Sequence, residues 1–410
     1  MSRQAQHSEL IIVGAGPAGL SAAIVASGNG LKVTVIDEFL EPGGRMLGQF
    51  HEEHGRWWVG KRIAEQLIET CGKQGVSIRC GLSVYGLLKS DGQWEVSTSG
   101  GRLTAPRVLL ATGAAEAPVP ADGWTLPGVM SIGAAQVMSN VYYVKPGDRG
   151  LIIGMNVLGM AIARELAVSG VSLAGIVLPP AGPFAGSSAL PKECLRLLMG
   201  LSHLAPSPVL RLGGRVAGAL GMTGLVSKFF PRRGIKLWDI PLMLRTAAIR
   251  INGTDHVESV TLADMNGEGE ILPGSERDVP VDFVALAGGL YPLAELAAVA
   301  GCPFLYTPEL GGHLPLHSER MLTPVEGLFV AGNITGVESA LVAMAQGRLA
   351  GASISHEAGA YGADGERHVA DAVEEVHRVR SSALIQFHPG IPEARKKIYQ
   401  LWQATYQAGG

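Results

Sequence analysis

The chain has few charged residues for its length. Charged side chains make up 17% of the 410 residues and the formal net charge is −3, so the composition gives no support for nucleic acid or an anionic membrane as a partner. A hydrophobic fraction of 47% and 56 glycines are typical of a well-buried α/β protein with many tight turns. The length suits two domains better than one.

Cysteines are few and lie far apart, with no CxxC or CxxxxC pair. This excludes a local metal knuckle, an iron–sulfur cluster of the usual cysteine spacing and a vicinal redox disulfide. Four free thiols in a reducing compartment are the simplest interpretation. Residues 51–54 (HEEH) lack the HExxH pattern and lie in a loop-like stretch, so we expect no metal there. The cysteines are Cys71, Cys80, Cys194 and Cys302.

Long apolar runs are also absent. No stretch of about 20 uncharged apolar residues occurs, which predicts no transmembrane segment. The closest candidate, residues 151–184, contains Arg164 and Glu165. The first ten residues are polar and lead straight into an expected strand, which does not fit a signal peptide. We therefore expect a soluble, cytoplasmic protein.

A dinucleotide-binding unit is predicted near the N-terminus. Residues 9–13 indicate a buried strand, residues 17–29 a helix and residues 32–36 a second strand. A GxGxxG pattern fills residues 14–19 between the first strand and the helix, and Asp37 follows the second strand. The result is a complete β-α-β unit of the right size with an acidic residue at its end.

Each glycine of this pattern has its own physical role. Gly14 allows the tight turn out of the strand, Gly16 lets the backbone approach a pyrophosphate, and Gly19 lets the helix pack close to the sheet. The helix N-terminus presents unpaired N–H groups to the phosphates. Asp37 can accept hydrogen bonds from both ribose hydroxyls, and Glu38 is a second candidate for that role.

Later segments favour FAD over NAD. Gly43 and Gly44 can cross over the pyrophosphate. Arg45 either neutralises the pyrophosphate or is an ordinary solvated arginine, and the sequence leaves these two alternatives open. Two further buried strands end in Ala-Thr-Gly (residues 111–113) and in Gly-Asn (residues 332–333). A last helix is predicted from about Glu338 to Ala350.

These segments together resemble the two-dinucleotide-binding-domain flavoproteins, the superfamily of thioredoxin reductase and glutathione reductase. The resemblance implies an α/β fold with two Rossmann-like domains, the second inserted into the first. It predicts an FAD-binding domain (residues 1–145 and 310–360), a degenerate NAD(P)-type domain (residues 146–309) and a C-terminal tail without an iron–sulfur module (residues 361–410).

The resemblance also implies which residues bind the FAD. Val84 lies on the strand whose backbone usually meets the adenine. Asn333 stands where the family has the aspartate that binds the ribityl chain, and an amide can still accept one hydrogen bond and donate another. Glu338 either faces the flavin pyrimidine edge or is an ordinary first-turn acid. The implied FAD-binding residues are Gly14, Gly16, Pro17, Ala18, Gly19, Asp37, Glu38, Gly43, Gly44, Arg45, Val84, Ala111, Thr112, Gly113, Gly332, Asn333 and Glu338; no catalytic residue is assigned.

A narrower resemblance is carried by residues 124–130 (WTLPGVM), 133–136, 301–306 and 310–315. They are similar to the FAD-carrying α subunits of multi-subunit amine and imino-acid dehydrogenases. This branch includes the A subunit of opine oxidase, dye-linked L-proline dehydrogenase α, D-hydroxyproline dehydrogenase and the B subunit of hydrogen cyanide synthase. Many of its members continue into an iron–sulfur module, whereas no cysteine follows Gly351 here. The resemblance therefore implies that an iron–sulfur cluster and a second flavin lie on partner subunits.

The second nucleotide-binding unit is expected to be degenerate. Residues 149–178 again indicate strand, turn, helix and strand, but Asn156 replaces the middle glycine of the motif. Its side chain would crowd a phosphate or bond to the loop itself. The next strand ends in Pro179 and Pro180, with no acid or arginine for a ribose hydroxyl or a 2′-phosphate. A structural relic is thus favoured over binding of NAD(P) or another nucleotide.

Residues 181–236 form an apolar insertion in this domain, with helices predicted at 197–204 and 216–230. It is either a surface helical subdomain or, as we slightly favour, a contact surface for a partner subunit. Its scattered basic residues are Arg211, Arg215, Lys228, Arg232 and Arg233.

The sequence as a whole favours an electron-relaying FAD subunit of a heteromeric amine or imino-acid dehydrogenase of the D-hydroxyproline, proline or opine type. The expected partners are a catalytic flavin subunit together with a small iron–sulfur subunit. One alternative is a stand-alone NAD(P)H-dependent FAD oxidoreductase. The other is a non-catalytic scaffold subunit whose FAD is structural.

Overall fold

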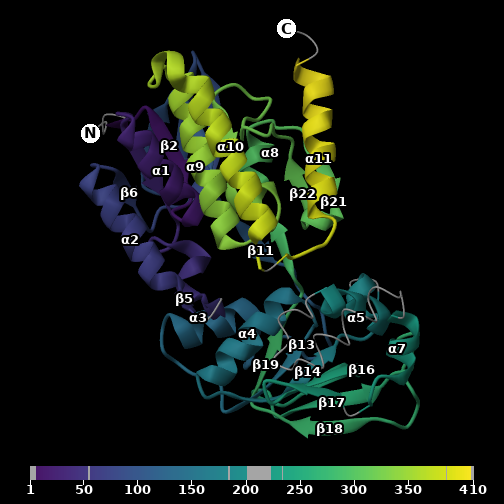
Figure 1. The fold of residues 1–410 in the computed structure, drawn as a ribbon. Coiled ribbons are helices and arrows are strands. Elements are labelled where there is room, and N and C mark those ends of the chain that lie inside the picture. The colour runs from purple at the N-terminus through teal and green to yellow at the C-terminus, as the bar shows by residue number, and fades with distance from the viewer. Residues whose placement is uncertain are drawn as a thin grey trace. The chain divides into compact units, whose positions relative to one another are not determined.

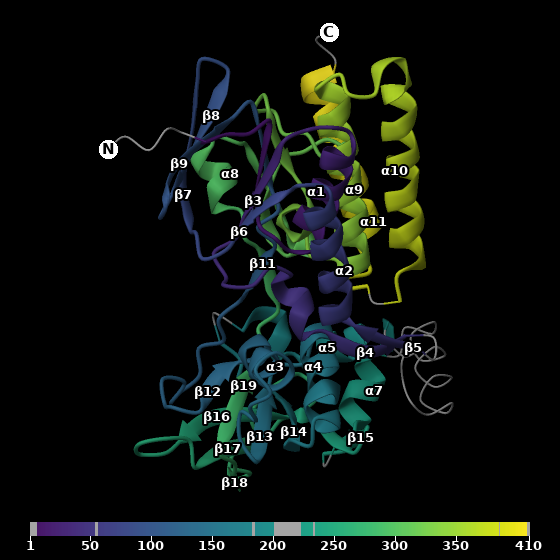
Figure 2. The ribbon, with the colours of Figure 1, turned by 90° about the vertical axis from the view of Figure 1, so that its left-hand side faces the viewer.

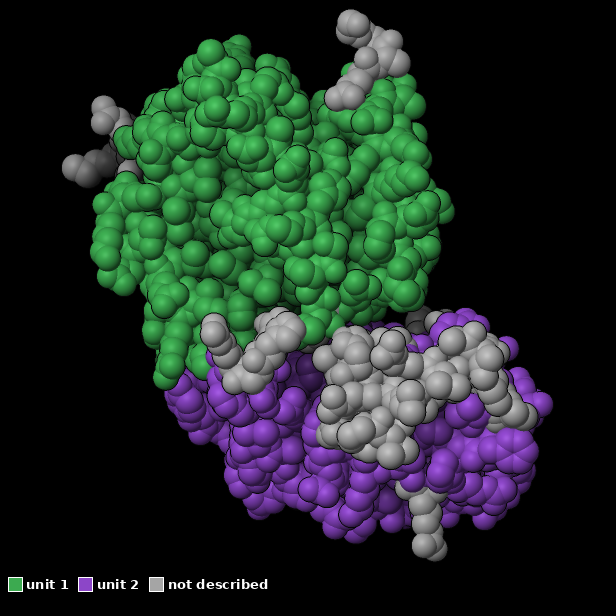
Figure 3. Space-filling model, in the orientation of Figure 1, with its two compact units in different colours: residues 1–49, 58–115, 290–410 green, residues 50–57, 116–289 purple. Residues whose placement is uncertain are grey.

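The computed structural model describes residues 6–53, 56–182, 185–200, 223–232, 234–384 and 386–407. The chain divides into two compact units, coloured separately in Figure 3. Unit 1 comprises Met1–Gln49, Trp58–Ala115 and Leu290–Gly410, and unit 2 comprises Phe50–Trp57 and Glu116–Gly289. Both contain neighbouring parallel strands and helices, which confirms the predicted α/β class. The predicted domain limits at residues 145 and 309 differ from these unit limits and stay predictions.

The core of unit 1 is a five-stranded parallel sheet (Figure 1). All residues of its two central apolar runs, LIIV and VTVI, are buried, as expected for strands covered on both faces. Leu10 lies between Val33 and Arg107 in the register. The strands in spatial order are β23 (Leu328–Val330), β10 (Arg107–Leu110), β2 (Leu10–Val13), β3 (Val33–Ile36) and β6 (Ser77–Arg79).

Helices α1 (Pro17–Gly28) and α9 (Ala340–Glu357) lie side by side and share one hydrophobic core with this sheet (Figures 1 and 2). Small residues let them approach closely. A Cβ added at Gly347 would lie 2.1 Å from the carbonyl oxygen of Ala18, and one at Gly351 would lie 2.7 Å from that of Ala22. Close packing of two helix backbones therefore fixes where α9 begins relative to the first turn of α1.

Residues after α9 form two further helices, α10 (Gly365–Ser382) and α11 (Ile391–Trp402), where the sequence predicts only a polar tail. Helix α10 packs along α9 (Figure 2), and an Arg348–Glu375 ion pair of 2.8 Å joins them. Helix α11 buries Ile398 and Trp402 in a separate cluster. Both helices are amphipathic. Their apolar faces are narrow and most of their residues are polar, so the sequence of this segment looks like a polar tail.

The remaining elements of unit 1 surround the parallel sheet. Strands β1 (Gln6–His7), β9 (Gly101–Ala105), β8 (Gln93–Thr98) and β7 (Val84–Ser90) form a second sheet in that order. The others are α2 (Gly60–Lys73), α8 (Glu295–Val299), the hairpin of β21 (Phe304–Thr307) and β22 (Gly312–Pro315), and the paired strands β11 (Ala114–Glu116) and β20 (Leu290–Pro292) near the unit limits.

Unit 2 contains an eight-stranded mixed sheet. In order, its strands are β12 (Val129–Ser131), β19 (Phe283–Leu286), β13 (Arg149–Ile153), β14 (Ser172–Leu178), β16 (Ile240–Asn252), β17 (Ser259–Asp264) and β18 (Arg277–Pro280), with β15 (Ile235–Leu237) beside β16. Its helices include α3 (Ile132–Asn140), α4 (Val157–Val168), α5 (Pro191–Gly200) and α7 (Thr223–Phe229). A separate two-stranded sheet is formed by β4 (Phe50–Glu53) and β5 (Arg56–Val59).

Helices α5 and α7 lie within the predicted insertion and overlap the two helices expected there. Residues 201–222, with Arg211 and Arg215, lie outside the described residues, as does Arg233. In the part of the chain that the structure describes, no helix combines the length and the apolar character needed to cross a bilayer.

A buried carboxyl group joins three segments of unit 2. Glu165 of α4 is 4% exposed. Its Oε2 accepts hydrogen bonds from Gln136 Nε2 at 2.7 Å and Asn140 Nδ2 at 2.8 Å, and its Oε1 accepts one from the Phe50 amide at 3.2 Å. Burial raises the pKa of Glu165 to about 7, although these three donors act in the opposite direction.

Glu165→Gln should change how stability depends on pH. The folded pKa of Glu165 exceeds the ordinary value of 4.5, so its stabilising contribution is fully present below pH 4.5 and is lost as pH rises to about 7. Between pH 5 and pH 8, the free energy of unfolding of the wild type should fall by roughly 2 kcal/mol relative to the variant. Urea unfolding at the two pH values measures this. Glu52→Gln, at an exposed ion pair with Arg164, is the control; an identical pH response of wild type and Glu165→Gln would refute the assignment.

Candidate functional site

Most of the predicted FAD-binding residues of unit 1 follow strands of its parallel sheet at the carboxyl edge, whereas Val84 begins β7 of the second sheet. Strands β2, β3, β10 and β23 all end there, because they are parallel neighbours. Ligands of open α/β sheets bind at this edge. The fold thus brings together segments that are as far apart in the sequence as residues 14–19 and 332–333.

The three glycines of the first motif differ in their surroundings. A Cβ at Gly14, where φ is +108°, would lie 2.3 Å from the carbonyl oxygen of Ala111, and one at Gly19 would lie 1.9 Å from that of Gly14. A Cβ at Gly16 would meet nothing within 4 Å. Gly14 and Gly19 are therefore required by packing, whereas Gly16 faces open space at the N-terminus of α1.

The N-terminus of α1 has no side-chain cap. Gly16 is its N-cap residue, and Pro17 and Ala18 begin the helix. The first N–H groups of a helix have no partner within it and are normally satisfied by a side chain, water or ligand. This end of α1 is suited to an anion such as a pyrophosphate.

Asp37 lies directly after β3 and contacts the glycine turn. Its Oδ2 accepts the Ala15 amide at 2.6 Å and its Oδ1 accepts the Phe39 amide at 2.9 Å. A carboxylate offers about four lone-pair positions, so capacity remains for ribose hydroxyls. Glu38 is exposed. Val84 packs in the hydrophobic cluster that contains Ile36, the residue before Asp37.

The segment after Asp37 folds back onto the glycine turn. The Gly43 amide donates to the carbonyl oxygen of Ala15 at 2.8 Å. A Cβ at Gly44 would lie 3.0 Å from the Cα of Gly16. The Arg45 side chain is exposed, and its Nε donates to the carbonyl oxygen of Ala114 at 2.9 Å. Both glycines therefore lie over the turn, as a pyrophosphate crossing requires.

The Ala-Thr-Gly segment continues β10 beside β2. The Ala111 amide donates to the carbonyl oxygen of Val13 at 2.8 Å, and the Thr112 hydroxyl donates to that of Leu293 at 2.5 Å. Gly113 has φ of +78°, and a Cβ there would meet nothing within 4 Å. Gly113, like Gly16, therefore faces open space at this edge of the sheet.

The segment after β23 approaches the first turn of α1. A Cβ at Gly332 would lie 2.8 Å from the Cβ of Ala18. The Gly332 amide donates to Gln346 Oε1 at 2.9 Å, and Asn333 Oδ1 accepts the Glu338 amide at 3.2 Å. The Asn333 side chain therefore shapes its own turn, and its Nδ2 group is the donor that it can offer to a ligand.

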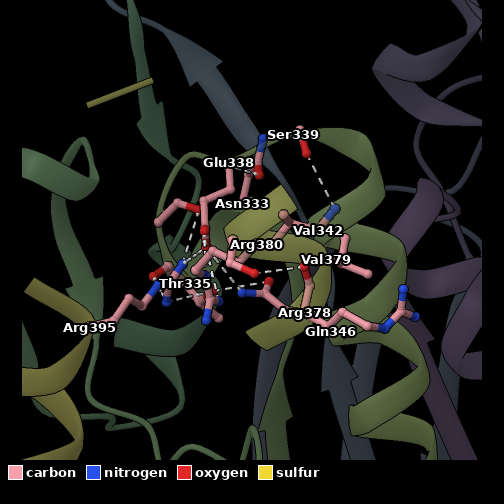
Figure 4. A network of polar contacts seen from close by, with 12 residues as sticks. Asn333, Thr335, Glu338, Ser339, Val342, Gln346, Arg378, Val379, Arg380 and Arg395 are labelled. Atoms are coloured by element: carbon pink, nitrogen blue, oxygen red, sulfur yellow. Dashed lines mark hydrogen bonds and ion pairs between the residues drawn. The ribbon is translucent and has the colours of Figure 1, made fainter. Parts of the chain in front are cut away.

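Glu338 precedes α9 instead of starting it. The helix begins at Ala340, and the hydroxyl of Ser339 caps it by accepting the Val342 amide at 3.4 Å. The alternative of an ordinary first-turn acid is therefore wrong, because Ser339 is the better N-cap residue. The Glu338 side chain is 5% exposed and lies in a polar cluster (Figure 4).

Two arginines from the C-terminal helices enclose this carboxylate. Arg380 of α10 donates from Nε to Glu338 Oε1 at 2.6 Å, and Arg395 of α11 donates from Nη2 to Oε2 at 2.6 Å. Burial by itself would raise the pKa of Glu338, but the charges and hydrogen bonds of Arg395 and Arg380 outweigh it and hold that pKa below its ordinary value. Glu338 is thus a buried anion.

His317 completes the cluster as a neutral side chain. Its Nδ1 lies 2.8 Å from the carbonyl oxygen of Pro315, which can only accept, so Nδ1 carries the proton. Its Nε2 then accepts from Arg395 Nη1 at 3.3 Å. Burial, aided by the charge of Arg395, lowers the pKa of His317 to about 3. One carboxylate and two guanidinium groups therefore leave one net positive charge.

The sequence gives no signal for Arg380, Arg395 or His317. The two arginines lie 42 and 57 residues after Glu338, in a segment that looks like a polar tail. Only the fold of α10 and α11 brings them to the turn.

The equivalent motif of unit 2 is closed by a side chain. Asn156 is the N-cap residue of α4: its Oδ1 accepts the Gly159 amide at 2.9 Å, and its Nδ2 donates to the carbonyl oxygen of Ala287 at 2.7 Å. A Cβ at Gly154 would lie 2.2 Å from that same oxygen, so the glycine that packing requires is retained. One of the N–H groups that an anion would use, that of Gly159, is already bonded.

Thiol chemistry has no support in this structure. All four cysteines are free, and Cys71, Cys194 and Cys302 are buried. Burial raises the pKa of Cys71 to about 11 and, with Glu193, that of Cys194 to about 12, which keeps both thiols protonated. Among the described residues, no three histidine, cysteine or acidic side chains are grouped to hold a metal; His54 lies outside those residues.

Known proteins resemble this chain over most of its length. Residues 8–196 match the family described as pyridine nucleotide-disulphide oxidoreductase. The A subunit of opine oxidase from Agrobacterium tumefaciens is 29% identical over 355 residues, covering 83% of this chain and 64% of that subunit. Hydrogen cyanide synthase subunit HcnB of Pseudomonas aeruginosa is 28% identical over 395 residues, covering 93% of this chain and 77% of that subunit.

Solved structures share the fold. L-proline dehydrogenase from P. horikoshii matches with a TM-score of 0.64 at 20% identity, covering 91% of this chain and 60% of that one. T. acidophilum thioredoxin reductase matches with a TM-score of 0.62 at 19% identity, covering 86% of this chain and 99% of that one. The chain spans less than two thirds of the proline dehydrogenase chain and of the opine oxidase subunit. The sequence matches confirm the resemblance inferred from the motifs: the chain is similar to HcnB and to the A subunit of opine oxidase, and the solved structures share its fold.

Proposed function

We propose that this chain is the FAD-binding subunit of a heteromeric amine or imino-acid dehydrogenase of the D-hydroxyproline, proline or opine type. In it, the chain relays electrons between an acceptor and a partner flavin subunit. The observation that carries the proposal is the contrast between the open turn at Gly16 in unit 1 and the turn closed by Asn156 in unit 2. The contrast supports an open dinucleotide site in unit 1 and a hindered one in unit 2.

The residues of unit 1 fit an FAD. The uncapped end of α1 and the glycines Gly16, Gly43 and Gly44 would hold the pyrophosphate. Asp37 would bind a ribose, and Asn333 would bind the ribityl chain through its free amide hydrogens. When bound, FAD supplies one- and two-electron transfer chemistry, while the protein orients it and tunes its electronics.

The closed turn of unit 2 supports a partner subunit as the source of the electrons. Asn156 uses its carboxamide to cap α4, so its side-chain oxygen occupies the Gly159 amide, one of the donors that a pyridine nucleotide would use. Free, protonated thiols offer no route for the electrons either. The chain's own residues therefore supply an acceptor site for electrons without a site for a nicotinamide donor.

The partners proposed are a catalytic flavin subunit together with a small iron–sulfur subunit. Support comes from the names of the relatives, which are subunits of opine oxidase and of hydrogen cyanide synthase. The cluster and the second flavin would lie on those partners. The apolar insertion at residues 181–236, of which 201–222 lie outside the described residues, is proposed as a contact surface for one of them.

The electron source gives a direct test. We expect the flavin of the full chain to resist rapid bleaching by NADH in a stopped-flow experiment. We also expect dye-linked amine oxidation only when the chain is co-purified with the products of neighbouring genes. Rapid bleaching would favour a stand-alone NAD(P)H-dependent oxidoreductase. A flavin that no donor reduces in the assembled complex would favour a scaffold subunit with structural FAD.

Gly16→Asn should convert the first turn into the closed form of the second. The new side chain enters open space, where it can cap α1, so the apo chain should lose no stability and gain roughly a few tenths of a kcal/mol. The affinity for FAD should fall at least about a hundredfold because the cap takes the place of the pyrophosphate. Equilibrium titration with FAD and thermal unfolding measure the two effects.

Gly72→Asn is the matched control for this variant, since Gly72 is exposed on α2 and a Cβ there also meets nothing. It should leave the affinity for FAD unchanged. Retained FAD affinity in Gly16→Asn would place the cofactor elsewhere.

A further inference from the structure

The turn formed by residues 332–339, here called the 332–339 turn, is held by side chains along its whole length. Gln346 Oε1 accepts the Gly332 amide at 2.9 Å, and Gln346 Nε2 donates to Glu338 Oε2 at 3.4 Å. Gly332 and Gly336 have φ of +79° and +130°, so the backbone adopts conformations that only glycine takes readily. Such a turn needs external contacts to stay in one conformation.

Arg395 supplies four of those contacts, one of them to Glu338. Its Nη1 donates to the carbonyl oxygen of Thr335 at 2.6 Å and to the Thr335 hydroxyl at 3.2 Å, and its Nη2 lies 3.5 Å from the carbonyl oxygen of Gly336. The Arg395 side chain is 3% exposed. A long, flexible side chain from α11 is thus immobilised on the backbone of the turn (Figure 4).

Arg380 does not bond to the turn backbone in any described contact, and acts on it through Glu338. Its Nε and Nη2 both bond to the carboxylate, at 2.6 and 3.2 Å, and its side chain is 12% exposed. Glu338 therefore connects the cluster, since Arg380, Arg395 and Gln346 all donate hydrogen bonds to its carboxylate.

We propose that Arg380 and Arg395, from the two C-terminal helices, are positioning residues that fix the 332–339 turn through Glu338 and leave one net positive charge beside it. That charge favours the reduced form of a flavin bound at the turn. This rests on the proposed function, in which Asn333 of the same turn contacts the FAD. The segment that looks like a polar tail is thereby part of the cofactor site.

The physical basis is the charge that a flavin gains. Two electrons and one proton convert the neutral ring system to an anion, which nearby positive charge stabilises. Burial makes the effect of the cluster larger than it would be in water, because the surrounding dielectric constant is low. The positive end of the α9 dipole acts in the same direction.

Charge variants separate this role from a merely structural one. Arg380→Gln removes a positive charge and should lower the midpoint potential of the bound flavin, whereas Glu338→Gln removes the negative charge and should raise it. The double variant Glu338→Gln/Arg380→Gln keeps the net charge and should return close to the wild-type potential. Loosening of the turn alone would shift both single variants in the same direction.

Arg348→Gln is the matched control. Arg348 also forms a two-bond pair with a carboxylate, Glu375, between α9 and α10, but it does not contact the 332–339 turn in any described interaction. Its potential should equal that of the wild type. Dye-equilibrated reduction of the full chain carrying FAD gives the potentials of the wild type and of the four variants.

A second readout needs no cofactor. Hydrogen exchange of the amides in residues 332–339 of the apo chain should be faster in Arg395→Gln and Arg380→Gln than in the wild type or Arg348→Gln. The proposed role would be overturned if the exchange rates of these amides did not change and if Arg380→Gln and Glu338→Gln shifted the midpoint potential in the same direction. A chain that takes up no FAD, yet shows the exchange effect, would instead refute the proposed function and, with it, the effect on the flavin.

Discussion

Close approach of one backbone segment to another is the constraint on which unit 1 depends. Gly14 touches the carbonyl of Ala111, Gly19 that of Gly14, and Gly347 that of Ala18, each within a distance that no Cβ permits. These contacts bring the ends of β2 and β10, and the start of α9, against the first turn of α1. The candidate site at the sheet edge follows from them, since they bring the glycine turns of three segments together.

The two units show what happens when one glycine of such a turn changes. Gly154 in unit 2 keeps the contact that packing requires, as Gly14 does in unit 1. The middle position differs: Gly16 leaves the helix end open, and Asn156 closes it with its own hydrogen bonds. The residue that packing requires and the residue that leaves the helix end open are therefore different members of one motif.

Local pattern was enough to predict the first β-α-β unit, the strands ending at residues 110 and 330, and the α/β class, because buried strands and glycine turns are encoded within short windows. The start of α9 was misplaced by two residues, since Ser339 and Glu338 are both plausible near a helix N-terminus. The Arg380–Glu338–Arg395 cluster escaped prediction because it depends on how α10 and α11 pack, and no spacing rule links residues so far apart.

We infer that the chain holds one dinucleotide, an FAD in unit 1, and none in unit 2. This inference can be tested by extraction and chromatographic identification of the nucleotides bound to the chain, purified in complex with its co-expressed neighbours. We expect one FAD for each copy of this chain, lost in Gly16→Asn while partner cofactors remain. A complex whose flavin content is unchanged by that substitution, or an NAD(P) bound at the turn of Asn156, would contradict it.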